Sequence, residues 1–401
     1  MRSAHQAAHS IQWLFAIVLM SLIGCSNNPP PTTPTTPTNG TPTTPGAGNG
    51  PIKVLVGANL ELSGDVGTWG QMSKRGMEIA AEEINADPKS GVQFKVIYED
   101  NASKADDSKK AVKKLILQDQ VNVIIGAVAS GDTLATIDIA KDEKIPLITH
   151  ASTNVTITKL GGEYVSRICF HDDFQGQCMA RFGLNELKAK TAVVIVAKGD
   201  PYSEGLVASF KKEFTSKGGT IVEEQAYQKG DQDFRTLSAK LKAANPDVVW
   251  LPGYFNEVAL IIKQARGEGF LKTFLGADGW DSPKLYQLGG ATLKDNYFCN
   301  HYSASDPNPM VQAFVKKFEE RHKEKPDAMA ALAYDALYCV ADAARRAGSA
   351  DPEKLKNAIN TIKDIKTLCG TVTMGPDREV IKDAVVLKTG ETDHIFYKNF
   401  K

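Results

Sequence analysis

The chain has 401 residues, more than one compact core usually holds, so we expect two domains. Lys and Arg together number 47, as do Asp and Glu, and the formal net charge is +0. This balance argues against a nucleic-acid partner, because binding to phosphates requires an excess of positive charge.

The N-terminus carries an apolar segment, residues 11–24, that is too short for a comfortable membrane span. It leads into the letters LIGC, which end at Cys25 and resemble the lipobox of bacterial lipoproteins, where the cysteine is lipidated. We therefore predict a signal peptide over residues 1–24 and an extracytoplasmic protein that meets the membrane only through a lipid on Cys25. An ordinary signal peptide that contains a cysteine is the alternative. The Pro- and Thr-rich remainder of residues 25–51 cannot bury a core and is expected to act as a tether.

Short β-branched runs alternate with longer amphipathic runs in the next part of the chain. We expect strands at 52–57, 94–98, 121–125 and 146–149, and helices at 73–84, 103–119 and 133–142. The pattern then repeats, with strands at 192–197, 220–226, 248–251 and 273–276, and helices at 203–217, 234–244 and 257–267. Such alternation predicts two parallel sheets covered on both faces by helices. Ligands bind at the carboxyl ends of such strands, so two facing modules would form a cleft.

The C-terminal part is predicted to complete these two modules. We expect helices at 309–322, 329–347 and 354–361, and short strands at 371–373 and 384–388. Five cysteines follow the predicted anchor, namely Cys169, Cys178, Cys299, Cys339 and Cys369. An odd number leaves at least one thiol free, and the histidines are scattered, so we expect no metal site and no cofactor.

Several motifs in this order resemble the periplasmic leucine/isoleucine/valine-binding protein family. They include Leu62-Ser63-Gly64, Trp69-Gly70, Ile145-Pro146-Leu147-Ile148, Ala151-Ser152-Thr153-Asn154, Gln175-Gly176, Tyr202-Ser203-Glu204-Gly205 and Lys263-Gln264-Ala265-Arg266. The resemblance covers essentially residues 52–388.

The resemblance implies the α/β fold of class I periplasmic binding proteins, with two Rossmann-like lobes joined by a three-strand hinge. One lobe would comprise residues 52–168 and 301–370, and the other residues 170–298 and 374–401. Three of the cysteines lie near the places where the resemblance implies that the chain crosses between the lobes. A disulfide among Cys169, Cys299 and Cys369 would stiffen the hinge. The implied role is that of a monomer that delivers its ligand to an ABC permease and its ATPase.

The resemblance also implies a site for the carboxylate of an amino acid. Ser130 matches the family position whose hydroxyl donates to that carboxylate, although a serine before a helix is equally suited to cap it. Thr153 matches a position that uses its hydroxyl and its N–H. Ala151 matches one that offers its carbonyl to the ammonium, and Ser152 lies between these two in the same loop. Taken alone, this loop would be an ordinary polar connection.

Asp278 falls where the family places an acid on the ligand ammonium. Relatives of the leucine binder carry Glu there, and an Asp before Gly is often only a turn residue. Tyr202, Tyr254 and Trp69 match positions in the walls of the cleft, with core packing as the alternative for each. Met329 matches a side-chain pocket position that is more often aromatic.

These residues favour reversible capture of an amino acid, branched-chain or otherwise apolar, by closure of the hinge. A receptor of the same fold that senses an amide or a carboxylic or aromatic acid for a signalling partner is the alternative. We expect no enzyme, because no GxGxxG follows the first strand and no GxSxG surrounds Ser130.

Overall fold

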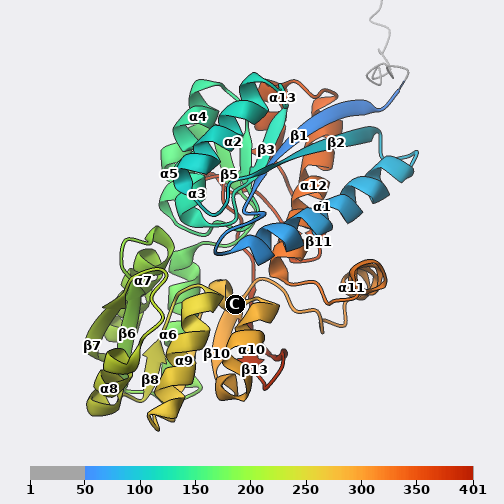
Figure 1. Cartoon of the computed structure of the whole chain (residues 1–401). Helices are drawn as coiled ribbons and strands as arrows, with labels where there is room; N and C mark the ends of the chain where they lie inside the picture. The colour runs from blue at the N-terminus through green and yellow to red at the C-terminus, as the bar shows by residue number, and fades with distance from the viewer. Residues whose placement is uncertain (1–49, 401) are drawn as a thin grey trace, which may run out of the picture. The chain divides into compact units, whose positions relative to one another are not determined.

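The structure, a computed structural model, describes residues 50–400, so the predicted signal peptide, Cys25 and nearly all of the tether lie outside it. Two main β-sheets form the frame of the described part, and helices pack on their faces (Figure 1). The predicted α/β architecture with two parallel-sheet lobes is therefore confirmed. Within residues 50–400, none of the helices combines the length and the apolar character that a membrane span requires.

The first sheet is entirely parallel and has the strand order β2-β1-β3-β4-β5. Its strands are β1 (Ile52–Leu60), β2 (Val92–Asp100), β3 (Val123–Gly126), β4 (Leu147–Thr149) and β5 (Val165–Arg167). The helices between them are α1 (Gly67–Ala86), α2 (Ala105–Leu117), α3 (Ser130–Leu134), α4 (Ile137–Asp142) and α5 (Thr156–Gly161). The central strands β3 and β4 are buried at every residue, as expected for parallel strands covered on both faces.

The second sheet has the order β14-β13-β10-β9-β8-β6-β7, in which only β13 and β14 run antiparallel to their neighbours. Its strands are β6 (Thr191–Ala197), β7 (Thr220–Tyr227), β8 (Val248–Trp250), β9 (Thr273–Gly276), β10 (Tyr297–Asn300), β13 (Ala384–Thr389) and β14 (His394–Phe400). Its helices are α6 (Asp172–Asn185), α7 (Pro201–Ser216), α8 (Arg235–Ala244), α9 (Phe255–Gly267) and α10 (Pro283–Gly289). Strand β14 was not predicted, because its residues are mostly exposed and show no apolar alternation.

The C-terminal helices belong beside the first sheet. They are α11 (Pro309–His322), α12 (Ala328–Ala347) and α13 (Pro352–Ile359), followed by the small antiparallel pair β11 (Ile365–Thr367) and β12 (Gly370–Val372). Helix α12 packs along α1. A Cβ added at Gly76 in α1 would lie 2.0 Å from the carbonyl oxygen of Ala330 in α12, so only glycine fits there.

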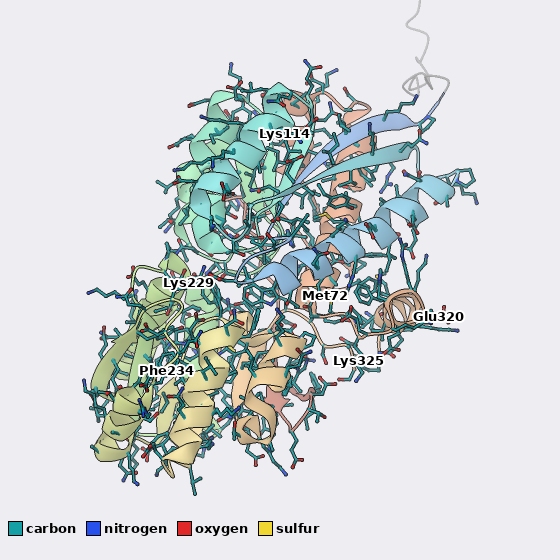
Figure 2. All side chains as sticks on the ribbon, in the orientation of Figure 1. Met72, Lys114, Lys229, Phe234, Glu320 and Lys325 are labelled. Carbon is teal, nitrogen blue, oxygen red and sulfur yellow. The ribbon has the colours of Figure 1, made fainter. Side chains whose placement is uncertain are left out.

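We call the first sheet with α1–α5 and α11–α13 lobe 1, and the second sheet with α6–α10 lobe 2. The chain passes between the lobes three times, after β5, after β10 and after β12. Side chains also connect the lobes directly. Lys229, labelled in Figure 2, extends from lobe 2 to within 3.2 Å of the Asp65 carboxylate in lobe 1.

The expected hinge disulfide is absent from residues 50–400. The five cysteines of this region, Cys169, Cys178, Cys299, Cys339 and Cys369, are all unbonded and buried. They fill apolar core positions, where a thiol behaves as a small hydrophobic side chain.

Candidate functional site

A small cavity lies where the strand ends of the two sheets meet. Its lining includes every predicted ligand-binding residue except Ser152, namely Trp69, Ser130, Ala151, Thr153, Tyr202, Tyr254, Asp278 and Met329. Most of these residues follow the carboxyl end of a strand, which is the place where open α/β sheets bind ligands. Met329 instead comes from the first turn of α12.

Aromatic rings close the cavity from both lobes. Trp69 of lobe 1 meets Tyr254 of lobe 2 edge to face, with ring centroids 5.1 Å apart, and Tyr254 stacks on Tyr202 at the same distance. The indole Nε1 of Trp69 also donates to the backbone oxygen of Asp281, at 2.8 Å. The walls predicted from sequence therefore contact one another across the lobes.

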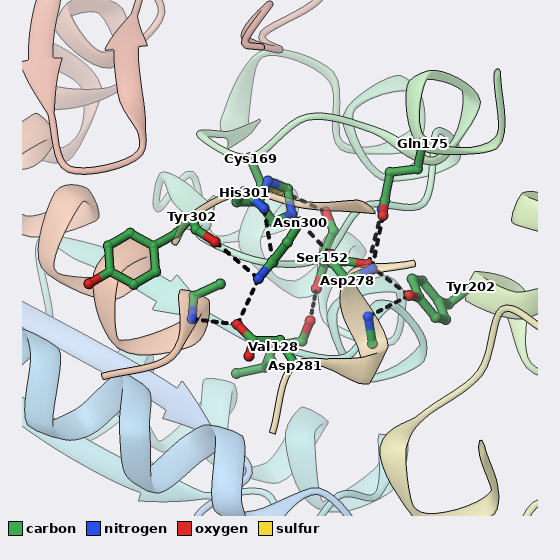
Figure 3. Close-up of polar contacts among 12 residues, drawn as sticks. Val128, Ser152, Cys169, Gln175, Tyr202, Asp278, Asp281, Asn300, His301 and Tyr302 are labelled. Carbon is green, nitrogen blue, oxygen red and sulfur yellow. Dashed lines mark hydrogen bonds and ion pairs between the residues drawn. The ribbon is translucent and has the colours of Figure 1, made fainter. Parts of the chain in front are cut away.

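Asp278 is the centre of a buried polar network (Figure 3). Its Oδ1 accepts hydrogen bonds from the hydroxyl of Tyr202 at 2.7 Å and from Nε2 of Gln175 at 3.0 Å. Its Oδ2 lies 2.9 Å from Nε2 of His301. Although Asp278 begins a short turn of 3-10 helix, its carboxylate faces this network, so the turn and the polar role coincide.

Two members of this network were not among the predicted site residues. Gln175 bonds to both the side chain and the backbone of Asp278, because its Oε1 also accepts from the Asp278 N–H at 3.1 Å. Burial lowers the pKa of His301 while the Asp278 carboxylate opposes that shift. The motif Gln175-Gly176 was visible in the sequence, whereas His301 carried no local signal.

Ser130 is the first residue of α3, and the capping position falls on Ala129, which offers no side-chain cap. The capping alternative for Ser130 is therefore wrong. Its Oγ instead accepts a hydrogen bond from the N–H of Asn154, at 3.3 Å. The hydroxyl proton of Ser130 has no acceptor among the hydrogen bonds within residues 50–400, so it is available to a ligand oxygen in the cavity.

Ser152, the remaining predicted site residue, does not line the cavity. Its hydroxyl lies 2.6 Å from Oγ1 of Thr133 and also donates to the backbone oxygens of Ala127 and Val128. These contacts use the hydrogen-bonding capacity of the Ser152 hydroxyl within lobe 1. Ser152 therefore supports the loop that carries Ala151 and Thr153.

Buried carboxyl groups surround the site. Both oxygens of Glu61 accept backbone N–H groups, from Val128 at 3.1 Å and from Ala129 at 3.0 Å. Burial, with the charge of Asp132 adding to it, raises the pKa of Glu61 to about 8. Burial, reinforced by the charge of Asp278, also raises the pKa of Asp172 well above its usual range. The neutral forms of Glu61 and Asp172 are therefore favoured.

The cavity measures about 20 Å³, whereas sites for small molecules measure about 300–1,000 Å³. It has room for about one water molecule. A solute the size of an amino acid can therefore enter only if the lining residues of the two lobes move apart.

Comparison with known proteins finds one family and several similar structures. The chain matches the family model described as periplasmic binding protein over residues 53–393. The leucine-, isoleucine-, valine-, threonine-, and alanine-binding protein of Pseudomonas aeruginosa is 30% identical, over 74% of this chain and 79% of that protein.

Two crystal structures are also similar to most of this chain. The leucine binding protein LivK of Thermotoga maritima has a TM-score of 0.83 and 34% identity, over 87% of this chain and 99% of that one. The branched-chain amino acid transporter substrate binding protein LivJ of Streptococcus pneumoniae, in complex with isoleucine, has a TM-score of 0.81 and 28% identity, with the same coverage.

Proposed function

The chain belongs to the periplasmic binding protein family, and we propose that it captures an apolar amino acid for an ABC importer. In this proposal the ligand is a branched-chain amino acid or one of similar character. The protein would be held outside the cytoplasm by a lipid on Cys25 and would hand its ligand to the permease and its ATPase.

Two kinds of polar group line one small cavity, and this observation carries the proposal. Asp278 supplies a buried carboxylate, while Ser130 and Thr153 supply hydroxyl groups. A free amino acid needs an acceptor for its ammonium and donors for its carboxylate, because an unpaired buried charge is costly. Charge-assisted hydrogen bonds contribute about 1.5–3 kcal/mol each, so a few such groups fix the orientation of the ligand.

The aromatic walls supply the remaining contact. Trp69, Tyr202 and Tyr254 would cover the apolar side chain of the ligand, with little rotamer entropy lost. Because Trp69 belongs to lobe 1 and Tyr254 to lobe 2, a ligand between them favours the closed arrangement of the lobes.

Calorimetry on the purified full-length chain tests the proposal. Leucine, isoleucine and valine are expected to bind, and benzoate is not, because it has no ammonium for Asp278. Asp278→Asn should weaken amino-acid binding about 10–100-fold, since one charge-assisted contact is lost. Asp138→Asn is the control, because Asp138 is an exposed surface carboxylate of α4.

Unchanged amino-acid affinity in Asp278→Asn would remove the assigned role of that carboxylate. Binding of benzoate without any amino acid would favour the alternative, a receptor for aromatic or carboxylic acids.

A further inference from the structure

A second and much larger cavity lies beside the candidate site. It measures about 760 Å³, which is within the range of about 300–1,000 Å³ typical of small-molecule sites. Its lining comes from residues 281–291 around α10, from the loop after β10, from α11 and the segment between α11 and α12, and from the turn between β13 and β14. Lys325, on the segment that leads to α12, is labelled in Figure 2.

Nδ1 of His394 in this lining has no hydrogen-bond partner within residues 50–400, and neither do three oxygens: Oδ1 of Asp281, Oδ2 of Asp327 and the hydroxyl of Tyr286. The three residues are only 2%, 5% and 8% exposed, respectively. Buried polar groups are nearly always paired, so three unpaired oxygens around one cavity indicate a missing hydrogen-bond donor.

The two carboxyl groups are held firmly in place. Oδ2 of Asp281 accepts from Nδ2 of Asn300 at 2.9 Å and from the N–H of Ala328 at 2.8 Å. Oδ1 of Asp327 accepts from the N–H of Ala330 at 3.0 Å. Burial and the neighbouring charge of Asp281 raise the pKa of Asp327 well above its usual range. A positive charge between the two would relieve their repulsion.

The other carboxylates of the lining already have cationic partners. Asp393 pairs with Lys325 at 2.9 Å, Glu391 pairs with Lys294 at 3.0 Å, and Glu324 pairs with Arg75. Asp281 and Asp327 have no Lys or Arg partner among the ion pairs of residues 50–400. Nε2 of His394 lies 3.9 Å from Oδ1 of Asp281, which is too far for a hydrogen bond.

The missing donor is better supplied by an organic cation than by a metal ion. Residues 50–400 contain no group of three or more His, Cys, Asp or Glu side chains arranged to hold a metal. An alkylammonium group has three donors and no acceptor, which suits the three unpaired oxygens of Asp281, Asp327 and Tyr286. Ala291, Val315 and Pro326 add apolar surface to the same lining.

We propose that this cavity is a second binding site, for a small organic ammonium ion that carries no carboxylate. Lys325 is the only lysine or arginine among the lining residues and is paired with Asp393, so neither residue type is free to face a ligand carboxylate. This separates the second site from the first, whose polar groups suit both ends of an amino acid.

Calorimetry with n-butylammonium chloride on the purified full-length chain tests this proposal, with sodium butyrate as the anion of the same carbon number. Saturable binding of n-butylammonium at one site, and none of butyrate, is expected. Asp281→Asn should weaken that binding about tenfold or more, because it puts an amide donor in place of a charged acceptor. The retained side-chain oxygen can still accept from Asn300 and Ala328, so the variant is expected to fold.

Tyr286→Phe removes only a hydroxyl and should weaken n-butylammonium binding by a smaller factor, about threefold. Glu391→Gln is the control within the same lining, because Glu391 is already paired with Lys294 and is expected to leave the affinity unchanged. Asp278→Asn, which alters the first site, should also leave it unchanged.

Three results would overturn the proposal: no saturable binding of n-butylammonium, equal affinity in wild type and in both Asp281→Asn and Tyr286→Phe, or displacement of n-butylammonium by leucine in direct competition. The Asp278→Asn variant separates the two proposals. It should weaken amino-acid binding at the first site and leave n-butylammonium binding at the second site unchanged.

Discussion

Asp278 is shorter than the glutamate expected from the family resemblance, and its neighbours show how the shorter acid is accommodated. Tyr202, Gln175 and His301 all reach its carboxylate, from α7, from α6 and from the segment after β10. These partners are neutral or weakly basic, so the negative charge of Asp278 is solvated by hydrogen bonds without being cancelled by a Lys or Arg. The carboxylate thus keeps its attraction for a ligand ammonium.

Ser130 offers a direct test of the other end of the proposed ligand. Ser130→Ala removes the hydroxyl donor and should weaken amino-acid binding about tenfold, as measured by calorimetry. Ser216→Ala is the control, because the Ser216 hydroxyl only donates to Glu213 of its own helix on an exposed surface. Equal losses in the two variants would contradict a ligand contact at Ser130.

Glu61 predicts a pH dependence of stability. Its pKa is about 8 in the folded chain, against an ordinary value of 4.5. Between these values the unfolded chain releases this proton while the folded chain keeps it. The free energy of unfolding should therefore fall as the pH rises, by up to roughly 1.4 kcal/mol per pH unit from this group.

Glu61→Gln removes that contribution, because glutamine does not ionise. Urea unfolding measures the free energy of unfolding of both proteins. The value for the variant minus the value for the wild type should increase as the pH is raised from about 5 to about 8. A constant difference between the two proteins over this range would show that Glu61 does not titrate as inferred.

At the scale of elements, the packing of α1 on α12 positions two residues of the candidate site. Trp69 lies in the first turn of α1, and Met329 lies in the first turn of α12. Their separation depends on the close approach of the two helices at Gly76 and Ala330.

Gly76→Ala should lower the free energy of unfolding by about 1–3 kcal/mol, because the new methyl group overlaps the carbonyl of Ala330 and pushes the helices apart. Amino-acid affinity should fall with it, as Trp69 and Met329 shift. Gly267→Ala in α9 is the control, because a Cβ there meets nothing within 4 Å and should stabilise the helix by about 0.5–1 kcal/mol. Denaturant titration measures both, and a Gly76→Ala variant as stable as wild type would contradict the packing argument.

In the whole described part of the chain, the hydrogen bond from the Trp69 indole to the backbone oxygen of Asp281 connects the two lobes at the candidate site. Trp69→Phe removes the donor to Asp281 and should shift the ligand-free protein toward an open state, by about fivefold in population. Small-angle X-ray scattering should then give a larger radius of gyration, which a saturating amino acid reduces. Trp280→Phe is the control, because the Trp280 indole donates to Leu251 within lobe 2. The same radius for wild type and Trp69→Phe without ligand would exclude this role.

The sequence predicted most of the architecture, because buried strands and amphipathic helices alternate clearly from Ile52 onward. Motifs at strand ends also named eight residues that the structure places around the small cavity. Ser152 was named with them because it stands in the same loop, but its hydroxyl bonds to Thr133, Ala127 and Val128, which the chain order does not reveal. His301 and the larger cavity were missed because their partners come from segments far apart in the chain, which only the folded arrangement brings together.

The burial of every cysteine in residues 50–400 has a practical consequence. Burial raises the pKa of the thiols of Cys169 and Cys339 to about 12, so they are poor nucleophiles toward maleimides. With Cys25 changed to serine, Asp65→Cys would introduce one reactive thiol into this region, at a point that faces Lys229 of the opposite lobe. A fluorophore attached there would change its emission as the lobes close, and the protein would become a biosensor for its own ligand.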